Sequence, residues 1–303
     1  MTTLRIENVS RWYGNVVAVN GITMNIAPGV TGLLGPNGAG KSTLIHLMGG
    51  FLAPSSGTVS LEGTAIWKNP EVYRHIGLVP ERESAYDFLT GGQFILAMAK
   101  LHKLSDPGAA ATKAIAMVEM DYAAGRAIGT YSKGMKQRIK MASALVHDPS
   151  VLLLDEPFNG MDPRQRLHLM DLIRQMAAEG RTILFSSHIL EEVERLATHI
   201  EVVVAGRHAA SGDFREIRRL MTDRPHVFAI RSTDDRVLAS AIIADGCASS
   251  VQLSDGGLQV EATDFRRFTQ LLPRVAKQAE VRLWEVSPSD ESLESVFSYL
   301  VAN

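Results

Sequence analysis

The chain has 303 residues, of which 46% are hydrophobic and 21% charged, and its formal net charge is -2. This is the composition of an ordinary globular protein of about two domains, so collagen, coiled coil and overall disorder are excluded. Because Lys and Arg do not outnumber Asp and Glu, general binding to a nucleic-acid backbone is not expected either.

Neither a signal peptide nor a membrane span is predicted. The chain opens without a basic start and apolar run, and nowhere do about 18 apolar residues stand together. Its single cysteine, Cys247, has no partner for an intramolecular disulfide, which fits a reducing compartment. We therefore expect a cytoplasmic protein.

The N-terminal segment predicts antiparallel strands around a phosphate-binding loop. Apolar and polar residues alternate in 21–26 and 58–62, which is typical of half-buried strands. Between them, the strand 30–34 is followed by a match to G-x-x-x-x-G-K-[ST] and then by an apolar helix. In this pattern backbone N–H groups and the helix N-terminus bind phosphate, while the Lys supplies charge and the Ser a hydroxyl for Mg²⁺. The expected phosphate-binding residues are Gly35, Pro36, Asn37, Gly38, Ala39, Gly40, Lys41, Ser42 and Thr43.

A mostly helical insertion is predicted between about residues 84 and 146. It contains the run Tyr131-Ser132-Lys133-Gly134-Met135-Lys136-Gln137-Arg138. Ser132 and the Gly134 amide open a helix there, and a helix start can bind an anion.

Three later runs, 151–154, 182–185 and 200–204, are nearly continuous apolar segments, as expected for parallel strands covered on both faces. The fold class is therefore α/β with a parallel core sheet. Asp155 and Glu156 end the first of these runs, and adjacent strand residues point in opposite directions, so the two carboxylates cannot share a role. One can hold Mg²⁺ while the other accepts the proton of an attacking water. His188 follows the second run at the same sheet edge, within reach of a γ-phosphate.

A domain boundary is predicted at Asp223-Arg224-Pro225, dividing the chain into residues 1–222 and 223–303. The second part predicts a strand at 226–231, a helix at 237–244, a hairpin of 251–253 and 258–260, a helix at 265–278 and a strand at 281–286. This β-α-β-β-α-β order is typical of a small ferredoxin-like domain.

A last helix is predicted to begin at Ser287-Pro288-Ser289-Asp290, with Ser as N-cap and Pro at the first helical position. One face of it would carry Leu293, Val296, Phe297 and Leu300. The C-terminal domain is expected either to extend a dimer or to bind a small regulator.

The ordered motifs together resemble the ATP-binding subunit of ABC transporters, over about residues 4–220. They are the phosphate loop, the 131–138 run, the Asp155-Glu156 strand, the stretch 160–163 and His188. Ser132, Gly134 and Gln137 match part of the family's Leu-Ser-Gly-Gly-Gln signature, whereas Tyr131 and Lys133 depart from it.

The resemblance implies a P-loop ATPase whose cofactors are ATP and Mg²⁺. Glu156, Lys41 and His188 would carry catalysis, and Ser42, Asp155 and Glu81 would meet the metal. Glu81 stands where most members have glutamine.

The resemblance also implies a homodimer in which two cassettes enclose two ATP molecules. Ser132 and Gly134 would bind the γ-phosphate held by the opposite copy, and Asp162 would cross the interface. Tyr13 would stack on adenine, with Trp12 as the alternative ring.

A separate membrane-spanning subunit is the implied partner, which would hold the chain on the cytoplasmic face of the membrane. Tyr86 to Gly91 and the C-terminal stretch 292–297 resemble the ABC-2 type exporter branch, which favours export. The alternative is a soluble, non-transport ABC ATPase acting on ribosomes or nucleic acid.

Overall fold

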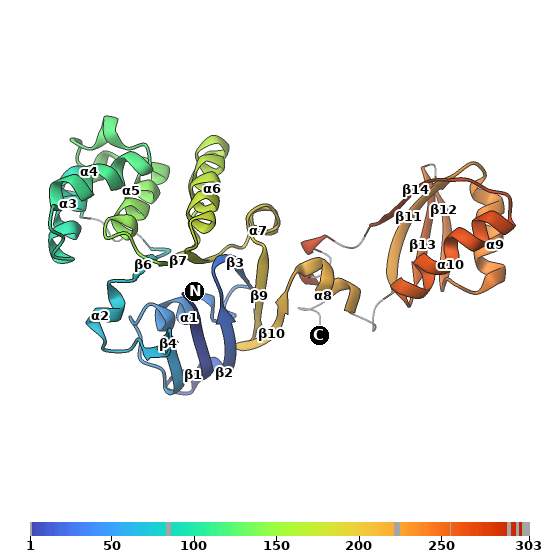
Figure 1. The fold of residues 1–303 in the computed structure, drawn as a ribbon, viewed down its shortest axis with the longest axis horizontal. Coiled ribbons are helices and arrows are strands. Elements are labelled where there is room, and N and C mark those ends of the chain that lie inside the picture. Colours follow the sequence, from blue (N-terminus) through green and yellow to red (C-terminus); the bar gives the residue numbers. More distant parts are fainter. Residues whose placement is uncertain are drawn as a thin grey trace. The chain divides into compact units, whose positions relative to one another are not determined.

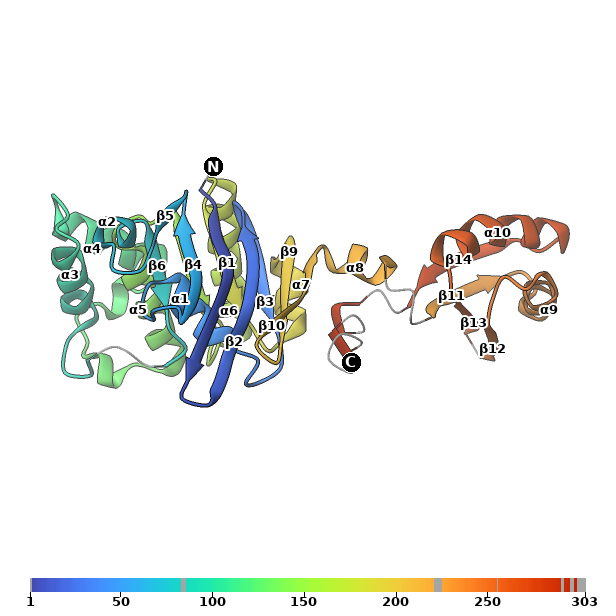
Figure 2. The same ribbon diagram turned by 90° about the horizontal axis from the view of Figure 1, so that it is seen from below.

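The structure is a computed structural model, and it describes residues 2–82, 86–220, 225–254, 256–289, 292–294 and 297–298. The chain divides into two compact units, Met1–Ser211 and Gly212–Asn303. The domain boundary expected after residue 222 therefore lies inside the second unit, and Asp223 and Arg224 themselves lie outside the described residues. Figures 1 and 2 show the elements of each unit.

The first unit begins with a four-stranded antiparallel sheet in the order β2-β1-β4-β5. Its strands are β1 (Leu4–Tyr13), β2 (Val16–Ile26), β4 (Ser56–Leu61) and β5 (Thr64–Ala65). Leu4 of β1 lies opposite both Ile26 and Leu61, so apolar side chains of three strands share one buried face. The predicted antiparallel part of the fold is confirmed.

A six-stranded sheet in the order β10-β9-β3-β8-β7-β6 forms the centre of this unit. Its strands are β3 (Gly29–Leu34), β6 (Ile76–Val79), β7 (Val151–Asp155), β8 (Thr182–Ser186), β9 (His199–Val204) and β10 (Arg207–Gly212). The strands β9, β3, β8, β7 and β6 pair in parallel. Every residue of β7 and β8 is buried, because helices or the other sheet cover both faces.

Helices cover the two faces of the central sheet (Figure 1). On one side α1 (Lys41–Met48) packs between the sheets, against β7 and against β1, β2 and β4. On the other side α6 (Pro163–Ala178) packs on β3 and β8, and α7 (Leu190–Leu196) packs on β3. A short helix α2 (Pro70–Tyr73) precedes β6. The parallel α/β core that the sequence predicts is therefore confirmed.

The predicted helical insertion is also present. It consists of α3 (Gly91–Leu101), α4 (Pro107–Met117), α5 (Lys133–Leu145) and the 3-10 turns Asp121–Ala123 and Ile128–Thr130. Each helix has a polar N-cap: Thr90 forms a capping box with Gln93, Asp106 caps α4 and Ser132 caps α5. The three helices pack on one another, and Figure 2 shows them gathered at one end of the first unit.

The second unit opens with α8 (Phe214–Leu220) and contains a four-stranded sheet in the order β12-β13-β11-β14. Its further elements are β11 (His226–Ser232), α9 (Asp235–Asp245), β12 (Ser250–Ser254), β13 (Gly257–Ala262), α10 (Phe265–Gln278) and β14 (Leu283–Pro288). Phe228, Phe268 and Leu238 are among the fully buried side chains where the helices meet the sheet. The expected ferredoxin-like order is confirmed.

The predicted start of the last helix is wrong. Pro288 belongs to β14, where it lies opposite Phe228, and Ser289 N–H donates to Val227 O at 2.8 Å. Because β14 is an edge strand, a proline at its end is tolerated there, so the Ser-Pro pair ends a strand instead of beginning a helix. Among the described residues of this stretch, helix begins at Leu293, which is buried. Asp290, Val296 and Leu300 lie outside the described residues.

Candidate active site

The glycine-rich loop joins β3 to α1, so the buried strand aims the loop and the helix begins directly after it. Gly40 stands just before the helix with φ 101°, and a Cβ on it would lie 2.4 Å from Ala18 O. Only glycine fits that conformation and that close approach. Among the described residues, no side-chain hydrogen bond caps the start of α1, and the first turn of this helix holds no acidic residue. Its first N–H groups are therefore available to an anion.

Lys41 folds back on the loop that precedes it. Its Nζ donates to Gly35 O at 2.7 Å and to Pro36 O at 3.1 Å. Burial lowers the pKa of Lys41, while the charges of Glu156, Asp155 and Glu81 act to raise it. A cation is thus held at the mouth of a loop built to receive phosphate.

The loop lines an open pocket of about 330 Å³. The carboxylates Glu81, Asp155 and Glu156 lie on its wall, as expected, together with loop and helix residues 37–43. Val16, Val17 and Ala18 of β2 also line it, although no pattern in the sequence marks them. They carry no chemistry of their own, so only the fold could identify them.

Asp155 is the last residue of β7 and is almost completely buried. Its Oδ1 accepts a hydrogen bond from Ser186 Oγ at 2.7 Å, whereas Oδ2 has no hydrogen-bond partner among the described residues. A buried carboxylate oxygen without a donor is costly unless a cation meets it. With the Ser42 hydroxyl and Glu81 in the same pocket, the donors are oxygens of the kind that Mg²⁺ prefers.

Few protein ligands are expected for such an ion, because Mg²⁺ keeps waters and binds substrate phosphates. No group of three or more His, Cys, Asp or Glu side chains placed to hold a metal occurs in the part of the chain that the structure describes. The buried Asp155 Oδ2 without a donor, beside Ser42 and Glu81, fits a Mg²⁺ ion that also binds phosphate oxygens.

Glu156 lines the same pocket as Asp155, although strand alternation alone would turn two adjacent side chains in opposite directions. The reason is its backbone, since Glu156 follows the end of β7 with φ 50°, where strand alternation no longer applies. Ser186 Oγ supports this conformation by accepting a hydrogen bond from Glu156 N at 3.0 Å. A non-glycine residue held at positive φ by its surroundings is typical of functional sites.

His188 lies beside Glu156, as its place after β8 predicts. His188 Nδ1 is 2.8 Å from Glu156 Oε2. Burial raises the pKa of Glu156, and the hydrogen bond and charge of His188 partly oppose this effect, as does Lys41. A carboxylate with raised pKa is a better proton acceptor near neutral pH.

The remaining expected phosphate-binding groups, Gly35 and Pro36 of the loop among them, are not lining residues of this pocket. Ser132 is exposed and caps α5, accepting a hydrogen bond from Met135 N at 3.2 Å. Gly134 lies against α6, where a Cβ would be 2.3 Å from Gln165 Oε1. Asp162 is exposed and caps α6 through Gln165 N at 2.9 Å. One chain therefore presents two helix starts that its own nucleotide pocket does not use.

Neither aromatic candidate for adenine stacking lines the pocket. Tyr13 and Trp12 are both nearly half exposed at the end of β1, and the Arg11 guanidinium lies 4.7 Å from the centre of the Tyr13 ring. The choice between the two rings stays a prediction.

Comparison with known proteins agrees with this geometry. A family model described as ABC transporter matches residues 19–159. The bacitracin transport ATP-binding protein BcrA of Enterococcus faecalis is 31% identical over 98% of this chain and 96% of its own length. The chain belongs to the ABC transporter family. It is an ATPase of that family, and its P-loop fold is the one that the sequence predicts.

Other similar proteins cover a smaller part of the chain. The linearmycin resistance ATP-binding protein LnrL of Bacillus subtilis is 36% identical over 69% of this chain and 68% of its own length. A solved structure of an ATP binding subunit of an ABC transporter superimposes with a TM-score of 0.65 at 28% identity, covering 71% of this ABC protein and 92% of that chain. Among the described residues, no helix is long and apolar enough to cross a membrane.

Proposed function

We propose that this chain is the ATP-hydrolysing subunit of an ABC-2 type exporter and acts on a separate membrane-spanning subunit. The names of its relatives support export: Nod factor export in Burkholderia orbicola, bacitracin transport in Enterococcus faecalis and daunorubicin resistance in Streptomyces coeruleorubidus. The last two match nearly the whole chain, so the second unit belongs to the resemblance as well. The chain would then act at the cytoplasmic face of the membrane, held by its partner.

The observation that carries the proposal is the Glu156-His188 pair, 2.8 Å apart, beside the phosphate loop. Glu156 would accept the proton of the attacking water, and His188 would hold its carboxylate and contact the γ-phosphate. Lys41 would exchange its loop carbonyls for phosphate oxygens. Mg²⁺, held by Ser42, Asp155 and Glu81, would neutralise developing charge on the phosphates when bound.

A second copy of the chain would complete the site. Ser132 and Asp162 are exposed at the starts of α5 and α6, outside their own pocket. Such helix starts suit an anion, and the γ-phosphate of a nucleotide in the opposite copy is the anion we assign to Ser132 and Gly134. Asp162 would then contact the other copy across the interface.

The test is Glu156→Gln. This variant should bind ATP as the unsubstituted chain does, form an ATP-dependent dimer and lose nearly all hydrolysis, because an amide cannot accept the proton. Undiminished turnover would exclude Glu156 as the base.

Purification of the Glu156→Gln chain from native membranes with ATP and Mg²⁺ tests the transport part of the proposal. A polytopic membrane protein in stoichiometric amount is expected. Ribosomes or nucleic acid without such a protein would replace the exporter with the non-transport alternative, while leaving the ATPase assignment intact.

A further inference from the structure

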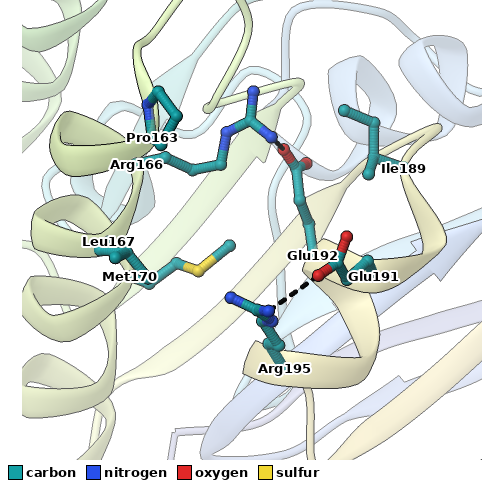
Figure 3. Close-up of a pocket in the computed structure, with 8 residues that line it drawn as sticks. All are labelled: Pro163, Arg166, Leu167, Met170, Ile189, Glu191, Glu192 and Arg195. Atoms are coloured by element: carbon teal, nitrogen blue, oxygen red, sulfur yellow. Dashed lines mark ion pairs between the residues drawn. The ribbon is translucent and has the colours of Figure 1, made fainter.

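A buried carboxylate joins the two loops on which the proposed mechanism depends. Glu192 lies in α7, in a pocket of about 230 Å³ between α6 and α7 (Figure 3). Its side chain is only 5% exposed. Burying a charge of this kind is costly unless partners compensate for it, so its partners define what it does.

The first partner is the loop that carries His188. Glu192 Oε2 accepts a hydrogen bond from Ser187 Oγ at 2.5 Å, and Ser187 Oγ in turn accepts one from Ile189 N at 3.0 Å. These bonds fix the residues on both sides of His188. The position of the His188 ring against Glu156 therefore depends on a contact that Glu192 makes.

The second partner lies on α6. Arg166 Nη1 is 3.1 Å from Glu192 Oε1, an ion pair that is not aligned as a hydrogen bond. Figure 3 shows Arg166 reaching from α6 toward Glu192. Arg166 lies one helical turn after Asp162, and the backbone N–H of Arg166 donates to the backbone carbonyl of Asp162 at 3.0 Å. The start of α6 is thereby tied to the same carboxylate.

We propose that Glu192 is a positioning residue that couples the His188 loop to the Asp162 end of α6. Through Ser187 it keeps His188 against Glu156 in its own site, and through Arg166 it holds the helix start that would meet the second copy. A displacement at the interface would thus be transmitted to the catalytic pair by two short contacts. This inference rests on the proposed function, because it assigns a role within that ATPase cycle.

The experiment compares Glu192→Gln with Glu191→Gln in the full-length chain. Glu191 is the preceding residue and lines the same pocket, but its ion pair with Arg195 is exposed on both sides and touches neither loop. Glu192→Gln should lower kcat by about tenfold or more, since small displacements of a catalytic group have effects of this size. KM for ATP should stay unchanged because Glu192 does not line the phosphate pocket. Glu191→Gln should match the unsubstituted chain in both constants.

Two further readouts separate positioning from a merely structural role. The Hill coefficient for ATP should fall toward one in Glu192→Gln, because coupling between the two copies is weakened. The acid limb of the pH-rate profile should move to higher pH in Glu192→Gln. A displaced His188 no longer lowers the pKa of Glu156, so this pKa rises further. Lys41 and Asp155 are then the charged groups that face the Glu156 carboxylate. Arg166→Gln should reproduce the loss of cooperativity while leaving the acid limb in place.

The outcomes are distinct. If Glu192→Gln keeps kcat, Hill coefficient and pH profile, the inference is overturned and the ATPase stands. A lowered melting temperature with unchanged activity per folded molecule would also overturn it, since the residue would then serve stability alone. If the unsubstituted chain does not hydrolyse ATP at all, the proposed function fails first and the inference with it.

Discussion

Ser186 connects the two carboxylates of the site, and its removal allows a quantitative prediction. It is completely buried at the end of β8, donates to Asp155 Oδ1 at 2.7 Å and accepts from Glu156 N at 3.0 Å. In Ser186→Ala, the lost bond to a charged acceptor costs about 2 kcal/mol, and the part-buried N–H left without an acceptor about 1 kcal/mol more. The expected loss in the free energy of unfolding is thus about 3 kcal/mol.

Urea denaturation followed by tryptophan fluorescence measures this change if the signal comes from the first unit alone. In a Trp284→Phe background, the remaining tryptophans, Trp12 and Trp67, both report on the first unit. Trp284 is 68% exposed, so its replacement should be nearly neutral. Thr112→Ala is the matched control, because that hydroxyl donates to Gly108 O at 3.0 Å on an exposed helix surface.

The control should change the free energy of unfolding by less than about 0.5 kcal/mol, as surface substitutions usually do. If Ser186→Ala costs no more than the control, the bridge does not hold the carboxylates and the reasoning is refuted. Hydrolysis should fall as well, because the backbone of Glu156 loses the acceptor that supports its positive φ.

Three further predictions concern pH and the loop around Glu81. Turnover at saturating ATP should fall on acidification with a midpoint above 4.5, the ordinary glutamate pKa, because burial raises the pKa of Glu156. A midpoint at 4.5 would contradict the assignment of Glu156 as the base. Burial and the neighbouring His102 lower the pKa of His147 to about 4 from 6.5. On acidification the unfolded chain therefore protonates His147 before the folded chain does, so the free energy of unfolding should fall as the pH drops from 6.5 toward 4. In urea titrations His147→Gln should reduce this dependence of the free energy of unfolding on pH. Lys140 Nζ donates to the carbonyls of residues 80–82 at 2.8, 3.2 and 3.4 Å. Lys140→Met should therefore lower the free energy of unfolding by about 2 kcal/mol and speed hydrogen exchange of the backbone amides in this loop. Unchanged exchange would show that this lysine does not hold the loop.

Elements with a clean period could be predicted from the sequence. The helix expected at 265–278 is α10 to the residue, because an Asp N-cap precedes a strongly amphipathic run. β1, by contrast, was not among the predicted strands. Its register shifts between Ile6 and Val9 and again near Arg11, and Asn8 has φ 49°, so the alternation that identifies a strand is interrupted.

The candidate site shows the same division. The phosphate loop, Asp155 and His188 could be predicted because their chemistry requires particular residue types after particular strands. The orientation of Glu156 could not, because strand alternation fails at a residue with positive φ. Val16 to Ala18 were missed for another reason: they contribute backbone and apolar surface, and only the folded chain places β2 beside the loop.

The strand order also bears on how the chain is synthesised. β3 leaves the ribosome early, yet both of its neighbours in the central sheet, β8 and β9, are formed by residues 182–204. Until the ribosome has released those residues, the apolar strand β3, which carries the phosphate loop, lacks both neighbouring strands. Pairing β3 with β8 and β9 closes a long segment of chain, and such long-range pairing is slow. Nascent chains shorter than this should be unable to retain nucleotide and should depend on chaperones, so ATP affinity would arise late and abruptly during translation.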